Sequence, residues 1–157
     1  MKYAGYMPND FLDGTGICVS LWTQGCPHHC KNCHNPETWD FDGGYEVPYD
    51  IIDRINKAIS SNDIQRNFSI LGGEPLCPEN KKFVSDVING VRDKYPNIKI
   101  YLWTGYTIEY LKSLNDDDIN NILNKINTLI DGPYVEELHS DKLYLRGSSN
   151  QRIIELN

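Results

Sequence analysis

Three closely spaced cysteines constrain this chain more than any other feature. Cys26, Cys30 and Cys33 follow the spacing Cys-x3-Cys-x2-Cys in a chain of 157 residues that has five cysteines. Because three thiolates on one loop cannot all pair as disulfides, this spacing indicates a metal or iron–sulfur centre. Three protein ligands leave one coordination position open, which favours chemistry at that position over a purely structural role.

The composition is that of a single globular domain, which we expect to span residues 1–157. A net charge of −7 and a pI near 5.0 argue against a general nucleic-acid or anionic-membrane binder. No apolar run has the length of a membrane span, and the first residues lack the apolar core of a signal peptide. We therefore expect a cytoplasmic protein, in a reducing compartment where cysteines can bind metal.

Strand and helix patterns alternate along most of the chain. Residues 1–16 are polar and glycine-rich, which predicts an irregular segment. The patterns predict strands over 17–23, 67–71, 98–103 and 127–130, and helices over 48–60, 78–95, 107–113 and 116–125. Residues 35–39 predict a short helical turn, with Asn35 as its cap and Pro36 at its first position. This alternation indicates an α/β fold with a largely parallel sheet.

Each predicted strand ends in a turn that contains glycine, and the first of these turns opens the cysteine loop. The glycines are Gly25, Gly72 with Gly73, Gly105 and Gly132. Because parallel strands end at the same edge of a sheet, we expect the functional site at that edge.

The turn Gly72-Gly73-Glu74-Pro75 is the second motif that suggests a ligand. Two glycines let the backbone approach a bound molecule closely, and Glu74 offers an acceptor for an ammonium group. A structural zinc site completed by His28, His29 or His34 is the alternative interpretation of the cysteines. It is disfavoured because no second cysteine knuckle exists.

The cysteine loop followed by Gly72-Gly73-Glu74-Pro75 resembles the radical S-adenosylmethionine enzymes. Residues 25–39 are similar to the branch of that superfamily that activates glycyl-radical enzymes. The short length and residues 130–134 and 146–152 are similar to the members that act on the anaerobic ribonucleoside-triphosphate reductase. The resemblance covers residues 10–152.

The resemblance implies a fold, two cofactors and a reaction. The fold would be an incomplete, open (βα) barrel, because the chain is too short for eight βα units. A [4Fe-4S] cluster would cleave S-adenosylmethionine reductively to a 5′-deoxyadenosyl radical. That radical would generate a glycyl radical on the large subunit of the reductase. The electron donor would be of flavodoxin type, and neither nucleic acid nor membrane would be a partner.

The resemblance also implies roles for individual residues. Cys26, Cys30 and Cys33 match the cluster ligands. Asn32 and His34 flank Cys33 and match positions beside the adenine of S-adenosylmethionine. Further residues match the cofactor-binding positions at the strand ends: Gly72, Gly73 and Glu74 for the methionine amino group, and Thr104 and Asp131 for the rest of the molecule.

Several interpretations stay open at this point. The chain could instead activate a different glycyl-radical enzyme, such as pyruvate formate-lyase, or it could be a zinc-binding module without catalysis. Cys18 is expected to be a small buried hydrophobe, and Cys77 is assigned no role. The segment with Arg146, Asn150 and Gln151 is either a loop tied to its own backbone or the side of the site that faces the reductase.

Overall fold

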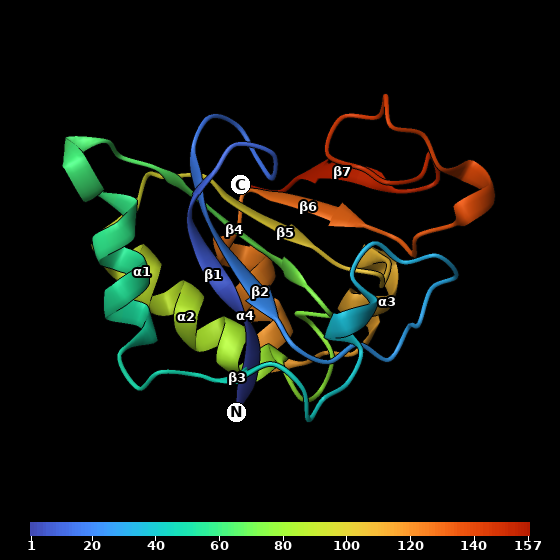
Figure 1. Cartoon of the computed structure of the whole chain (residues 1–157), viewed down its shortest axis with the longest axis horizontal. Helices are drawn as coiled ribbons and strands as arrows, with labels where there is room; N and C mark the ends of the chain where they lie inside the picture. The colour runs from blue at the N-terminus through green and yellow to red at the C-terminus, as the bar shows by residue number, and fades with distance from the viewer.

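The computed structural model describes residues 1–157, which form a mixed seven-stranded sheet in the order β3-β1-β2-β4-β5-β6-β7 (Figure 1). The strands are β1 (Lys2–Asp10), β2 (Cys18–Thr23), β3 (Tyr45–Glu46), β4 (Asn67–Gly72), β5 (Ile100–Trp103), β6 (Thr128–Asp131) and β7 (Arg152–Glu155). The α-helices are α1 (Ile51–Ile59), α2 (Lys81–Lys94), α3 (Ile108–Ser113) and α4 (Asp117–Lys125). None of the helices has the length and apolar character needed to cross a membrane.

The centre of the sheet is parallel and its edges are antiparallel. Strands β2, β4, β5 and β6 pair in parallel, whereas β1 pairs with β2, β3 with β1, and β7 with β6 in antiparallel fashion. The edge strands β3 and β7 do not pair with each other, so the sheet is open. The predicted α/β fold with a largely parallel sheet is confirmed.

The prediction of an irregular segment over residues 1–16 was wrong for its first part. Residues 2–10 form β1, although only Tyr3 and Asp10 of that strand are buried. Its pairing with β2 is interrupted by register shifts next to Gly5 and before Asp10. Backbone pairing with β2 and β3 therefore defines this strand, and apolar alternation, the usual sequence signal of a half-buried strand, is missing.

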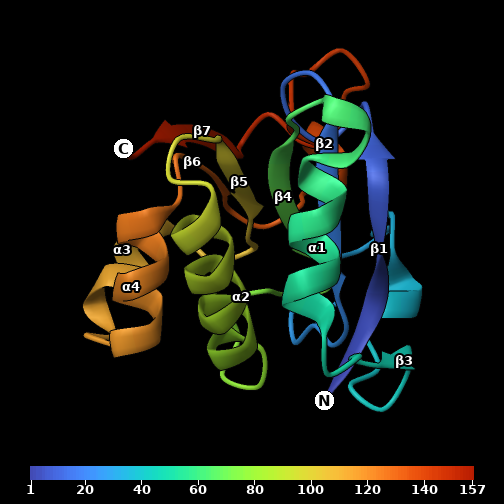
Figure 2. The same ribbon diagram turned by 90° about the vertical axis from the view of Figure 1, so that its left-hand side faces the viewer.

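The two faces of the sheet are covered by different structures. Helices α1, α2 and α4 lie side by side along one face (Figure 2). The apolar side chains of that interface come from the strands at Val19, Leu21, Phe68, Ile70, Ile100, Leu102 and Leu129, and from the helices at Ile55, Ile59, Val84, Val87, Ile88, Val91, Ile119 and Ile122. Full burial of one such side chain contributes about 1.5–3 kcal/mol, so this interface is the main source of stability.

Loops cover the other face of the sheet, which also borders a cavity. The Tyr101 hydroxyl donates to Thr15 Oγ1 at 2.6 Å, and the Trp103 indole N–H donates to the Leu145 carbonyl at 2.8 Å. Strand β5 is therefore covered on both faces, by helices on one side and by loops on the other. The loop-covered face is where ligands can enter.

Candidate functional site

The cysteine loop leaves the end of β2 and folds back on itself. Gly25 donates its N–H to the Thr38 carbonyl at 2.7 Å, and Cys26 donates to the Trp39 carbonyl at 3.2 Å. A 3-10 turn over Pro36–Thr38 completes the loop, which confirms the short helical turn expected there. The loop is thereby anchored at both ends beside the strand ends (Figure 1).

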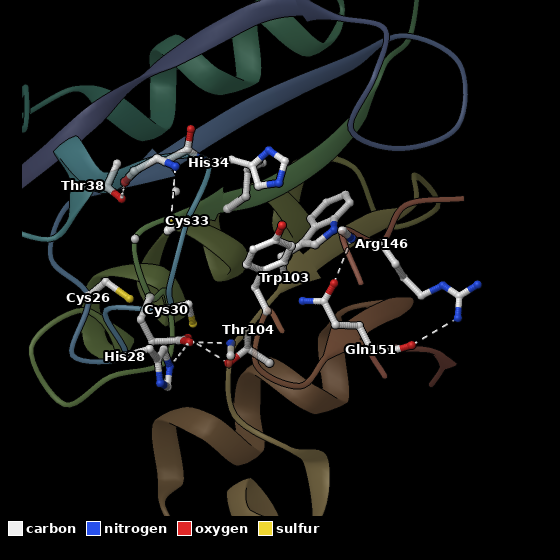
Figure 3. A pocket seen from close by; sticks show the side chains of 18 of the residues that line it. Cys26, His28, Cys30, Cys33, His34, Thr38, Trp103, Thr104, Arg146 and Gln151 are labelled. Carbon is white, nitrogen blue, oxygen red and sulfur yellow. Dashed lines mark hydrogen bonds and ion pairs between the residues drawn. The ribbon is translucent and has the colours of Figure 1, made fainter. Parts of the chain in front are cut away.

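Two left-handed residues turn the loop so that its thiols face the same region. His29 has φ 47° and Asn32 has φ 56°, and Cys33 donates its N–H to the Cys30 carbonyl at 3.1 Å. All three cysteines border one cavity of about 540 Å³, and they are labelled in Figure 3. Cys26 is buried, and Cys30 and Cys33 are half-buried.

The three cysteines border one space without converging on one point. No three side chains of His, Cys, Asp or Glu are gathered closely enough to ligate one metal ion. A cubane binds each cysteine to a different iron atom, so its ligands need to border one space and do not need to converge on one point. The backbone N–H of Asn35 also approaches Cys33 Sγ at 3.4 Å, the kind of contact that tunes cluster potentials.

The histidines of the loop are engaged elsewhere, which weighs against the zinc alternative. The His28 ring bonds to Glu74, and the His29 ring stacks on Trp39 at a centroid distance of 4.5 Å. The His34 ring packs edge-on against Tyr134 at 5.2 Å. No histidine is therefore arranged with the cysteines as a fourth zinc ligand.

Burial governs the protonation of the first cysteine. It raises the pKa of Cys26 to about 11, against the opposing effect of hydrogen bonds from the backbone N–H groups of His28 and His29. The thiol is therefore protonated at neutral pH in the free protein. Binding of a metal to this sulfur would release that proton, because thiols bind metals as thiolates.

The turn after β4 needs both of its glycines. Gly72 has φ +109°, and a Cβ atom on it would lie 2.5 Å from the Thr23 backbone nitrogen. A Cβ atom on Gly73 would lie 2.4 Å from the Gly25 carbonyl oxygen. The turn and the cysteine loop thus pack backbone to backbone, which only glycine permits.

Glu74 is the most enclosed charged group of the site, with 1% of the residue exposed. Its carboxylate accepts hydrogen bonds from Thr104 Oγ1 at 2.8 Å and from the N–H of Gly105 at 2.7 Å. It also accepts from the N–H of Leu76 at 2.9 Å and contacts His28 Nε2 at 2.7 Å. Glu74 therefore links the ends of β4 and β5 to the cysteine loop.

The structure brings most of the predicted site residues to the cavity. The residues that border it are Cys26, Cys30, Cys33, His34, Gly72, Gly73, Glu74 and Thr104. Asn32 is exposed on the loop and Asp131 lies outside the lining. Asp131 instead accepts from the N–H of Ile108 at 2.9 Å and from Arg152 Nε at 3.0 Å.

The two remaining cysteines are buried, and both thiols are enclosed. Cys18 is fully buried in β2, as predicted for a small hydrophobe. The Cys77 thiol donates to the Glu74 carbonyl at 3.2 Å, and burial raises the pKa of Cys77 to about 12. Neither thiol borders the cavity.

Sequence reasoning missed the contact between His28 and Glu74, which joins residues 46 positions apart. It left two interpretations of the Arg146 segment, and the structure supports part of each. The Gln151 side chain accepts from the N–H groups of Gly147 and Ser148 at 2.9 and 3.2 Å, so this loop is tied to its own backbone. Arg146 nevertheless borders the cavity.

Three free thiols and a Gly-Gly-Glu turn around one cavity define an iron–sulfur protein of the single-cluster class. The family model described as a 4Fe-4S single cluster domain matches residues 12–154. Three curated relatives are anaerobic ribonucleoside-triphosphate reductase-activating proteins. That of Vibrio cholerae is 35% identical over 98% of this chain and 97% of its own length. That of Enterobacteria phage T4 is 35% identical over 98% and 93%, and that of Escherichia coli K12 is 32% identical over 99% of both. The chain belongs to this family of activating proteins.

Proposed function

We propose that this protein activates an anaerobic ribonucleoside-triphosphate reductase by generating a glycyl radical on its large subunit. Family membership over nearly the whole chain carries this proposal, together with three free thiols around one cavity. The [4Fe-4S] cluster would supply one electron to S-adenosylmethionine, yielding methionine and a 5′-deoxyadenosyl radical that removes a hydrogen atom from glycine. The hard chemistry belongs to the cofactors, and the chain supplies binding, orientation and exclusion of water.

The residues around the cavity divide this work. Cys26, Cys30 and Cys33 hold the cluster. The backbone of the Gly72-Gly73 turn faces the same cavity and receives the amino group of the cosubstrate. The Gly73 carbonyl oxygen makes no hydrogen bond within the chain, which leaves it available as an acceptor.

The residues proposed to bind the adenosine half of S-adenosylmethionine are His34, Asn32 and Thr104. His34 borders the cavity beside Cys33, and Asn32 lies on the other flank of that cysteine. Thr104 lies at the end of β5 with its hydroxyl held by Glu74. Asp131 lies outside the cavity lining and fastens the start of α3 to β7, because its carboxylate accepts from the N–H of Ile108 and from Arg152.

The fold suits a protein substrate. We propose that residues 1–157 form a single domain whose open sheet is an incomplete (βα) barrel of the radical S-adenosylmethionine type. The unclosed sheet and the loop-covered face support this proposal, because a glycine in a partner protein needs a wide entrance. We further propose a flavodoxin-type electron donor and a cytoplasmic location, in keeping with five free cysteines.

The test is an anaerobic reconstitution of the protein with iron and sulfide. With dithionite, S-adenosylmethionine and the reductase, we expect equal amounts of methionine and 5′-deoxyadenosine and a glycyl radical signal in electron paramagnetic resonance (EPR). A cluster-loaded protein that leaves S-adenosylmethionine intact would refute the proposal. A colourless protein that retains zinc would favour the alternative of a non-catalytic zinc-binding module. A glycyl radical that forms only on pyruvate formate-lyase would show that this enzyme, and not the reductase, is the protein substrate.

A further inference from the structure

The Glu74 carboxylate has no acceptor position left for a ligand. An ionised carboxylate offers about four lone-pair sites. Oε1 is in contact with His28 Nε2 and the N–H of Gly105, and Oε2 accepts from the N–H of Leu76 and from Thr104 Oγ1. A ligand ammonium group could reach this carboxylate only by displacing one of these donors.

The His28 ring is held in place by more than its bond to Glu74. A Cβ atom on Gly105 would lie 2.6 Å from His28 Cδ2, so the ring packs directly on the backbone there. Tyr106 packs edge-on against the ring at a centroid distance of 4.6 Å. Figure 3 shows His28 and Thr104 on the same side of the cavity as Cys26 and Cys30, with dashed lines leading from both to one carboxylate.

His28 lies between two cluster ligands in the sequence, so its tether acts on both. The same junction is reinforced by the backbone, because Glu74 donates its N–H to the Gly25 carbonyl at 2.8 Å. The Asn80 side chain donates to the Glu74 carbonyl at 3.0 Å and to the Gln24 carbonyl at 3.0 Å. These bonds fix the start of the loop, whereas the His28 side chain ties the middle of the loop to Glu74.

We propose that His28 is a positioning residue that, through Glu74, sets the segment between Cys26 and Cys30 against the end of β5. Glu74 then serves the reaction through His28 and does not itself contact the methionine ammonium, which binds to backbone acceptors of the Gly72-Gly73 turn. This inference rests on the proposed function, because it concerns the placement of S-adenosylmethionine against the cluster.

The experiment compares His28→Ala, Glu74→Gln and the double variant, each reconstituted with iron and sulfide. His29→Ala is the matched control, since His29 lies in the same loop but stacks on Trp39 and does not touch Glu74. The readouts are iron and sulfide content and the change that S-adenosylmethionine causes in the EPR spectrum of the reduced cluster.

We expect His28→Ala to retain its cluster and to need about tenfold more S-adenosylmethionine for the half-maximal spectral change, the usual scale for groups that orient metal ligands. The double variant should be no worse than the more affected single variant, because both substitutions break the same link. Multiplying effects would instead indicate that Glu74 contacts the ammonium directly, which would overturn the proposal. Unchanged binding in His28→Ala would also overturn it.

A conservative variant covers the case in which His28→Ala fails to take up a cluster. His28→Gln keeps an N–H donor that can bond to Glu74, so we expect it to restore both cluster content and binding. A His28→Gln protein as impaired as His28→Ala would contradict the proposal. A wild-type protein whose EPR spectrum does not change on addition of S-adenosylmethionine would instead refute the proposed function. Failure of the His28 proposal and failure of the proposed function can therefore be distinguished.

Discussion

The ends of β4 and β6 place two acids in equivalent positions, with different consequences. Glu74 and Asp131 each follow or end a central parallel strand, and each is 1% exposed. Glu74 bonds to His28 of the cysteine loop, whereas Asp131 bonds to Arg152 of the edge strand β7. One acid is thus connected to the cysteine loop, and the other fastens the edge of the sheet to α3. Equal burial at equivalent positions does not imply equal function.

The cysteines proposed to hold the cluster give the largest expected effect. Replacing Cys30 by alanine should abolish cluster assembly and all cleavage of S-adenosylmethionine, because two thiolates cannot hold the cubane. Iron content and the absorbance of the reconstituted protein check this directly. Cys77→Ala is the matched control, since that buried thiol does not border the cavity. Full activity in Cys30→Ala would remove the basis for placing the reaction at this loop.

At the end of β4, Glu74→Ala should impair both stability and cofactor binding. The substitution leaves the N–H groups of Leu76 and Gly105 and the Thr104 hydroxyl without their acceptor. Each buried donor left unsatisfied costs about 1–3 kcal/mol. Urea unfolding measures the loss of stability, and EPR titration with S-adenosylmethionine measures the loss of binding. A Glu74→Ala variant that loses stability but binds S-adenosylmethionine normally would show that Glu74, like Asp131, has only a structural role.

At the end of β6, Arg152→Met should lower stability while leaving cofactor binding intact. The substitution removes the guanidinium that bonds to Asp131 and also bonds to Glu109 at 2.8 and 2.7 Å. Because Arg152 is exposed and its ion pairs are screened by solvent, the loss in the free energy of unfolding should be smaller than the loss caused by Glu74→Ala. Chemical denaturation provides the measurement. A changed EPR response to S-adenosylmethionine would show that Asp131 also affects cofactor binding, and would contradict the difference proposed between Asp131 and Glu74.

A third acid, Asp13, borders the cavity and has another acid, Asp10, as its partner. Burial, with the hydrogen bond and the negative charge of Asp10, raises the pKa of Asp13 to about 7. Between about pH 4 and about pH 7, Asp13 is protonated in the folded state but ionised in the unfolded state. The free energy of unfolding therefore falls as the pH rises through that range. Asp13→Asn should flatten this decline in urea unfolding. An equally steep decline in the variant would assign it to other groups.

Local patterns in the sequence were sufficient for the central strands and the two site motifs. Apolar runs predicted β2, β4, β5 and β6. The spacing of Cys26, Cys30 and Cys33 predicted a shared metal or iron–sulfur centre, and all three residues border one cavity. Strand β1 was not predicted, because its pairing with β2 and β3 defines it and only Tyr3 and Asp10 of its residues are buried.

The partners of the buried acids could not be predicted, because they depend on contacts between distant parts of the chain. His28 and Glu74 are 46 positions apart, and Asp131 and Arg152 are 21 apart. The sequence places Glu74 and Asp131 alike at strand ends, and only the packing of the cysteine loop and β7 separates their roles. Neither contact follows from helical or strand periodicity.

Transfer of a hydrogen atom from glycine is the central claim, and isotopic labelling tests it most directly. The cluster-loaded protein would be mixed with dithionite, S-adenosylmethionine and a reductase whose glycines carry deuterium at Cα. We predict that deuterium appears in 5′-deoxyadenosine in step with the glycyl radical signal. Unlabelled 5′-deoxyadenosine accompanying a full glycyl radical signal would contradict direct abstraction from glycine.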